Sequence, residues 1–115
     1  MNSNLAAFLR VIREGESSQD DDIAYRMKYG GGLVDDLSEH PNTVVSAGGL
    51  SSTAAGAYQF LFRTWRELRL PDFSPKSQDE GAVMLIKRRG AYEDVINGNF
   101  EQAIYKVNKE WASMP

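Results

Sequence analysis

Two glutamates near the end of the first predicted helix, Glu14 and Glu16, have the side chain needed for acid–base chemistry. At about 100° per residue, Glu16 projects onto the apolar stripe of that helix, whereas Glu14 projects to the opposite side. If the helix extends through residue 16, the Glu16 carboxyl points toward the core or a cleft. Partial burial and the negative end of the helix dipole then both raise its pKa, as a general acid near neutral pH requires.

Gly15 supports a competing interpretation, because glycine is common at helix ends. If the helix frays there, Glu16 is a solvated carboxylate, which is the usual state of acidic residues. Judged from its angle around the helix alone, Glu16 is more often expected to be solvated than functional.

A run of small residues from Ser51 to Gly56 precedes Tyr58 and Gln59. Small side chains allow a sugar or a backbone to approach closely, and the two larger residues supply a stacking face and an amide. We therefore interpret the segment as a candidate sugar-binding site. The ordinary alternative, preferred for this segment taken alone, is a hairpin with Tyr58 in the core.

The composition excludes several classes of protein. The 16 acidic and 13 basic residues give a net charge of −3, which argues against binding to nucleic acid or to an anionic membrane. The absence of cysteine excludes disulfides, thiol nucleophiles and cysteine-based zinc sites, and a single histidine excludes a multi-histidine metal site. That histidine, His40, precedes a proline and is predicted to make a local hydrogen bond in a loop.

The elements around these residues predict one α+β domain over residues 1–115. A helix capped by Asn2 or Ser3 runs to about Gly15, with Arg10 and Arg13 directed away from its apolar stripe of Leu5, Phe8, Leu9 and Ile12. A polar loop over 15–22 and a small antiparallel sheet within 30–56 follow, and 57–60 forms either its last strand or the start of a helix. The rest of the chain is predicted as helices over 61–68, from a Ser77/Glu80 capping box to Gly90, over 92–96, and from Asn99 through Trp111.

Several motifs, in this order, resemble the lysozymes (endolysins) of the bacteriophage lambda family. The resemblance covers nearly the whole chain and is carried by Ala7-Phe8-Leu9 with a glutamate eight residues beyond Phe8, Gly31-Gly32, Glu39-His40-Pro41, Ser52 to Gln59, Asp72 to Asp79, Ile86 with Arg89-Gly90-Ala91, and Trp111-Ala112-Ser113-Met114-Pro115.

This resemblance implies a lysozyme-like fold, mainly helical, with a small antiparallel sheet that lines a cleft. It also implies a lytic transglycosylase, which cuts the β-1,4 bond between N-acetylmuramic acid and N-acetylglucosamine in peptidoglycan and leaves a 1,6-anhydro-muramic end. The family's catalytic glutamate falls on Glu16, and Ser52, Thr53, Tyr58 and Gln59 would line the sugar cleft. No metal or cofactor is implied.

Two departures from the family pattern keep alternatives open. The family has Ser-Glu-Gly-Thr where this chain has Gly15-Glu16-Ser17-Ser18, which leaves Glu14 as a minor rival. The family also continues past the Trp-Ala-Ser-x-Pro motif with a lip of the cleft, whereas this chain stops at Pro115. A module that binds peptidoglycan without cutting it is therefore one alternative. A hydrolase is another, with a second carboxylate from Asp35, Asp36 or the run Asp20-Asp21-Asp22.

The expected place of action is the periplasm. No apolar run approaches the roughly 20 residues of a membrane span, and the N-terminus lacks the basic region of a secretory signal. We therefore expect accumulation in the host cytoplasm, without stable membrane insertion, and release to the cell wall through a lesion made by a holin.

Overall fold

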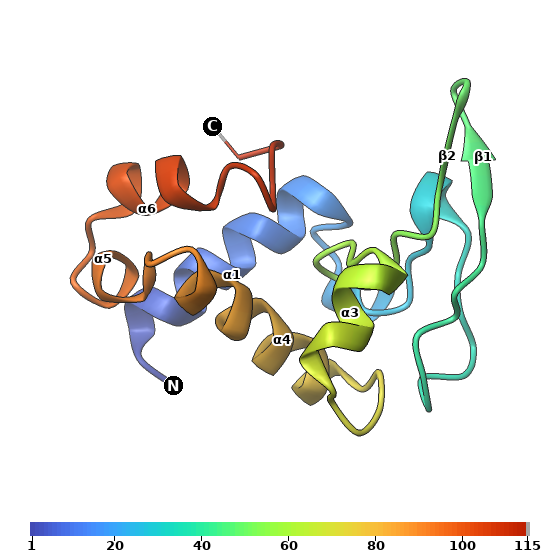
Figure 1. Cartoon of the computed structure of the whole chain (residues 1–115), viewed down its shortest axis with the longest axis horizontal. Coiled ribbons are helices and arrows are strands. Elements are labelled where there is room, and N and C mark those ends of the chain that lie inside the picture. The colour runs from blue at the N-terminus through green and yellow to red at the C-terminus, as the bar shows by residue number, and fades with distance from the viewer. Residues whose placement is uncertain (115) are drawn as a thin grey trace.

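The computed structural model describes residues 1–114, so Pro115 of the Trp-Ala-Ser-x-Pro motif lies outside the described residues. Its elements are mainly helical and include a two-stranded antiparallel sheet, which confirms the predicted α+β class (Figure 1). In chain order they are α1 (Ser3–Glu16), α2 (Asp21–Ala24), the short 3₁₀ helix η1 (Tyr29–Gly31), β1 (Val45–Ala47), β2 (Leu50–Ser52), α3 (Phe62–Leu68), α4 (Pro75–Arg88), α5 (Tyr92–Ile96) and α6 (Phe100–Val107).

Helix α1 begins at a side-chain cap and ends at Glu16. The Asn2 Oδ1 accepts hydrogen bonds from the backbone N–H groups of Asn4 and Leu5 at 2.8 and 3.1 Å, which satisfies two donors of the first turn. The predicted apolar stripe is buried as expected. The helix continues through Gly15, so fraying at that glycine is not what the structure shows.

The region predicted as a sheet contains less regular structure than expected. Strands β1 and β2 have three residues each and pair Val45 with Ser52 and Ala47 with Leu50, while most of 30–44 is irregular. Residues 56–59 form a turn closed by a bridge between Ala55 and Phe60, rather than a strand or the start of a helix. Helix α2 begins inside the predicted polar loop and ends two residues beyond it, and Asp20 caps it by accepting from two backbone N–H groups.

The later helices lie where predicted, with two corrections at their ends. Helix α4 is capped by Ser74 rather than by a Ser77/Glu80 box, because Pro75 already supplies the first helical position. The Ser77 hydroxyl instead donates to Asp72 at 2.6 Å. Helix α6 ends at Val107, so Trp111 lies beyond the helix, although its side chain is buried as predicted.

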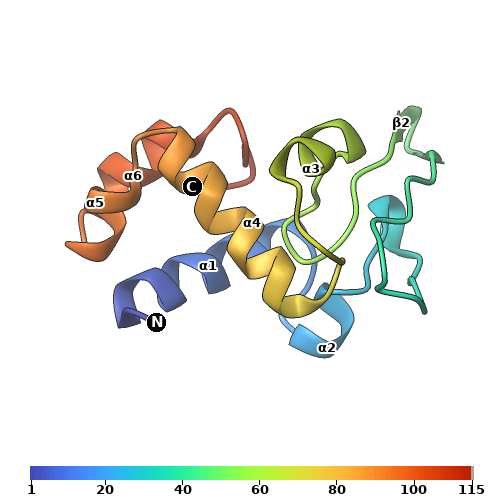
Figure 2. The same cartoon turned by 60° about the horizontal axis from the view of Figure 1, so that its bottom comes forward.

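The elements form a row that places the sheet far from the last helices (Figures 1 and 2). The β1–β2 hairpin lies at one end of the molecule, α5 and α6 lie at the other, and α1 and α4 run between them. After α6 the chain returns to the end of α1, where Ser113 contacts Glu16. The residues around Ala57 and the C-terminal segment therefore meet near the last turn of α1.

The core is continuous along this row. Aromatic rings from α3 and its neighbouring loops pack together. The Trp65 ring is centred 4.8 Å from Phe73 in an edge-to-face arrangement and 4.8 Å from Phe60 in a tilted one. Within residues 1–114, no helix has the length and apolar character required to cross a membrane.

Candidate active site

Glu16 is the last residue of α1, and its carboxyl is half-buried. Burial raises the pKa of Glu16, and a hydrogen bond donated by the Ser113 hydroxyl to Oε2 opposes this rise more weakly. The raised pKa favours a protonated acid at higher pH than for a solvated glutamate. This is the electrostatic setting that the helix angle predicted for Glu16.

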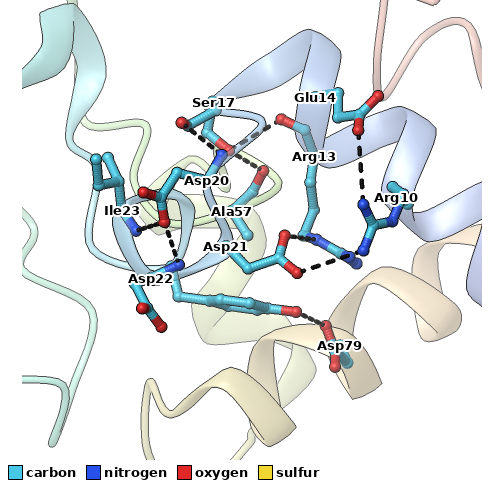
Figure 3. A network of polar contacts seen from close by, with 12 residues as sticks. Arg10, Arg13, Glu14, Ser17, Asp20, Asp21, Asp22, Ile23, Ala57 and Asp79 are labelled. Atoms are coloured by element: carbon cyan, nitrogen blue, oxygen red, sulfur yellow. Dashed lines mark hydrogen bonds and ion pairs between the residues drawn. The ribbon is translucent and has the colours of Figure 1, made fainter.

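Glu14 has the opposite environment. Its side chain is exposed and lies 3.9 Å from the guanidinium of Arg10, one turn earlier on α1 (Figure 3). Such an exposed pair contributes little stability, and nothing buries the Glu14 carboxyl. Glu14 therefore lacks the features of a general acid.

The two residues that follow α1, Ser17 and Ser18, are hydrogen-bonded to the last turn of the helix. The carbonyl oxygen of Arg13 accepts from the backbone N–H groups of Ser17 and Ser18 at 2.8 and 3.2 Å. The Ser17 hydroxyl lies 3.0 Å from that carbonyl oxygen and 2.8 Å from the carbonyl oxygen of Ala57. The backbone that presents Glu16 is thus connected to the turn that carries Gln59.

The Arg13 side chain is buried, which corrects the expectation that it points away from the core. Its guanidinium donates to Asp21 at 3.2 Å (Figure 3). It also donates to the Tyr58 hydroxyl at 3.1 Å. The Tyr58 hydroxyl in turn donates to Asp79 at 2.5 Å, and Tyr25 donates to the same carboxylate oxygen at 2.8 Å. This polar network fixes α1 against α2, α4 and the 56–59 turn.

Tyr58 itself is wholly buried, so its ring offers no open stacking face. The family resemblance implies a place for Tyr58 in the sugar cleft, but the structure matches the alternative in the core. There Arg13 and Asp79 supply the partners that the hydroxyl requires. Burial raises the pKa of Tyr58, and the pKa of Tyr25 rises to about 12 for the same reason. Both phenols therefore remain protonated donors at any physiological pH.

Gln59 lies beside Tyr58 and is only half-buried. Its Nε2 donates to the carbonyl oxygens of Met27 and Gly56 at 3.0 and 2.8 Å, and its φ of 50° places it in the left-handed region. The residue lines a pocket of about 250 Å³ together with Thr64 and Trp111. Gln59 is therefore held rigidly at a concave surface.

Ser52 and Thr53 line a different pocket, of about 340 Å³, with Val44, Leu61 and Arg63. Their hydroxyls accept from backbone N–H groups of Ala54 and Phe62 at 3.0 and 3.1 Å. Val44 and Leu61 expose 66% and 42% of their surface there. The predicted sugar-binding residues are thus distributed over two concave surfaces.

His40 is buried, and its ring nitrogens hold the loop before β1. Nδ1 accepts from the backbone N–H of Asn42 at 2.9 Å, so Nε2 carries the proton and donates to the Phe60 carbonyl oxygen at 2.8 Å. Burial lowers the pKa of His40. The predicted local hydrogen bond is confirmed, and a longer-range one accompanies it.

Three of the aspartates considered as a second carboxylate have local structural roles. Asp20 caps α2, Asp21 pairs with Arg13 and Arg10, and Asp36 accepts from the backbone N–H of Ser38. Within residues 1–114 no group of three or more His, Asp or Glu side chains is arranged to hold a metal ion.

Two residues at the site were not predicted from the sequence as functional. Ser113 belongs to the Trp-Ala-Ser-x-Pro motif, but nothing in its spacing indicates a contact with α1. Arg13 follows Leu9 by four residues, so the helical period itself was a signal that its side chain reaches the buried face.

Comparisons with known proteins identify relatives over the whole chain. The family model described as Endolysin matches residues 6–115. The endolysin of Escherichia phage lambda is 38% identical over 125 residues, which cover 100% of this chain and 79% of the relative. The endolysin of Escherichia phage P2 is 35% identical over 133 residues, covering 99% of this chain and 81% of the relative.

The fold is also similar to solved structures. Bacteriophage lambda lysozyme in complex with a chitohexasaccharide matches with a TM-score of 0.90 and 38% identity, over 100% of this chain and 81% of that one. A second structure of lysozyme from bacteriophage lambda matches with a TM-score of 0.89 and 37% identity, over the same shares. The chain therefore belongs to the endolysin family and has the fold of bacteriophage lambda lysozyme.

Proposed function

We propose that this endolysin degrades peptidoglycan by lytic transglycosylation, with Glu16 as the single catalytic acid and base. The bond cut is the β-1,4 link between N-acetylmuramic acid and N-acetylglucosamine. The product is a 1,6-anhydro-muramic end, formed without water.

The reaction needs one carboxyl group that changes role. Protonated Glu16 donates its proton to the glycosidic oxygen as that oxygen leaves the anomeric carbon of the muramic residue. The resulting carboxylate then removes the proton from the muramic C6 hydroxyl, whose oxygen forms the new bond to the anomeric carbon. Glu16 ends protonated again, so atoms and charge balance without a second carboxylate, whereas hydrolases usually use two.

The observation that carries this proposal is the half-buried carboxyl of Glu16 at the end of α1, with its raised pKa. Its hydrogen-bond partner is a neutral hydroxyl, so the carboxyl can gain and lose a proton. A cationic partner would keep it ionised and so unable to act as an acid. The complex of bacteriophage lambda lysozyme with a chitohexasaccharide supports a glycan strand as the substrate.

We propose that the glycan strand contacts Ser52, Thr53 and Gln59. Half-exposed Val44 and Leu61 beside the first two offer apolar surface, which suits the apolar faces of sugar rings. Tyr58 supports this surface from inside through its hydrogen bonds rather than by stacking on a sugar.

The test is digestion of purified peptidoglycan by the chain and by Glu16→Gln, with the released fragments identified by mass spectrometry. We expect anhydro-muramic ends from the parent and a loss of roughly 10²- to 10⁴-fold in rate for Glu16→Gln, the usual range for a positioned acid or base. Glu14→Gln is the matched control, because it makes the same change two residues earlier on an exposed side chain. It should retain activity.

The other outcomes identify the alternatives. Reducing muramic ends would indicate hydrolysis and would direct attention to the aspartates. Binding to the wall without release of fragments would indicate a binding module. The expected holin-dependent release is tested separately, by expressing the chain in a host with and without a holin and following lysis.

A further inference from the structure

The C-terminal segment places one hydroxyl on the candidate catalytic carboxyl. Ser113 lies 97 residues from Glu16 in sequence, and its hydroxyl donates a hydrogen bond to Oε2. We propose that Ser113 is a positioning residue for the reaction: it occupies Oε2 so that the transferable proton resides on Oε1. This inference rests on the proposed role of Glu16.

The segment that carries Ser113 is anchored on both sides. Trp111 and Met114 expose only 2% and 7% of their surface. The Trp111 indole N–H donates to the backbone carbonyl oxygen of Tyr58 at 3.0 Å, in the 56–59 turn. Ser113 is exposed between these two anchors, so the backbone places its hydroxyl even though water can reach the side chain.

Gly15 allows this segment to approach α1 closely. A Cβ at position 15 would lie 3.1 Å from the Ser113 Oγ, which is tighter than most real contacts of a Cβ. The glycine before Glu16 therefore provides space for the Ser113 hydroxyl rather than ending the helix.

A serine suits both halves of the proposed reaction. When Glu16 is protonated on Oε1, Oε2 is a carbonyl oxygen that accepts a hydrogen bond from the Ser113 hydroxyl. When Glu16 is ionised, the same hydrogen bond becomes charge-assisted and stronger. The contact therefore persists while the proton on Oε1 departs and returns, and it fixes the plane of the carboxyl throughout.

The experiment compares Ser113→Ala with the parent in two measurements. The first is the titration of the Glu16 carboxyl, followed by NMR with ¹³C-labelled glutamate and assigned with Glu16→Gln. The second is the pH profile of kcat/KM on purified glycan strands, whose alkaline limb reports deprotonation of the acid. Because the Ser113 hydrogen bond lowers the pKa of Glu16, its removal should shift both the titration and the alkaline limb to higher pH.

We also expect kcat to fall about tenfold, near the lower end for loss of a hydrogen bond to a charged group, since Ser113 is exposed. Ser113→Thr keeps a hydroxyl and should restore both values. Ser17→Ala is the matched control: it removes a hydroxyl next to Glu16 that bonds to backbone carbonyls and not to the carboxyl. It should lower stability without moving the alkaline limb.

The outcomes separate this inference from the proposed function. An unchanged Glu16 titration in Ser113→Ala overturns the role of Ser113, whatever happens to activity. A shift of the alkaline limb by Ser17→Ala equal to that of Ser113→Ala also overturns it, because the effect would then be structural. Full activity of Glu16→Gln overturns the proposed function and the inference that depends on it.

Discussion

Gly56 provides a quantitative test of how the turn before Gln59 is held. Its φ is +83°, and a Cβ there would lie 2.8 Å from Phe73 Cζ and 2.9 Å from Gln78 Cδ, both on wholly buried side chains. Gly49, in the β1–β2 turn, has a φ of +81° but nothing within 4 Å of the same added atom. Changing each glycine to alanine therefore applies the same backbone strain and differs only in packing.

The magnitude follows from these two contributions. Alanine in the left-handed region costs about 1–2 kcal/mol at either site, partly offset by the lower entropy of the unfolded chain. At position 56 overpacking adds about 1–3 kcal/mol. If Gln78 moves to relieve the contact, its hydrogen bond from the Ala57 N–H is also lost, at about 1–3 kcal/mol. Gly56→Ala should thus be less stable than Gly49→Ala by roughly 2 kcal/mol or more.

The assay is urea unfolding of the parent and both variants, followed by tryptophan fluorescence and by circular dichroism to establish a two-state transition. A domain of this size has a total stability of about 5–15 kcal/mol, so Gly56→Ala should still fold and give a measurable midpoint. Equal losses in the two variants would refute the reasoning, because packing at Gly56 would then contribute nothing.

Three further predictions concern buried polar groups. Gln78→Ala leaves two buried backbone groups and one half-buried group without their partners. The free energy of unfolding should therefore fall by about 3 kcal/mol or more in urea unfolding, and a loss below about 1 kcal/mol would contradict this. Burial lowers the pKa of His40, so on acidification the histidine is protonated in the unfolded chain before it is protonated in the folded protein. Stability should therefore fall as the pH drops below about 6.5. In a His40→Gln variant stability should depend less on pH, and an unchanged dependence would argue against the histidine as the cause. Because the pKa of Glu16 is raised, ionisation of this carboxyl destabilises the folded state. Glu16→Gln should therefore have a higher melting temperature than the parent, and the difference should grow as the pH rises through that pKa. A difference that does not depend on pH would indicate another cause.

The parts of the site that depend on local periodicity were predictable from the sequence. The helical period separated Glu16 from Glu14, and the structure gives these two residues the expected environments. The prediction that Arg13 is directed away from the buried face was wrong. Its position four residues after Leu9 places it on the buried side, where Asp21 and Tyr58 satisfy the guanidinium.

Tyr58 shows why residue type alone does not assign a binding role. A tyrosine next to small residues suits both a sugar platform and a core position, and the sequence contains no information on which side of the turn the ring faces. The choice depends on partners that are distant in sequence, since Arg13 and Asp79 lie 45 and 21 residues away. Their hydrogen bonds make burial of the phenol favourable.

The same limit applies most strongly to Ser113. No hydrophobic period in the sequence marks the exposed position of Ser113. Its contact with Glu16 arises because Trp111 and Met114 on either side of it are both buried near the end of α1. The acid and its partner are thus specified differently: helical geometry determines where Glu16 points, whereas tertiary packing determines what it meets. A change that loosens the Trp111 anchor should therefore alter the titration of Glu16 while leaving α1 intact, even though that indole is bonded to Tyr58 rather than to the carboxyl.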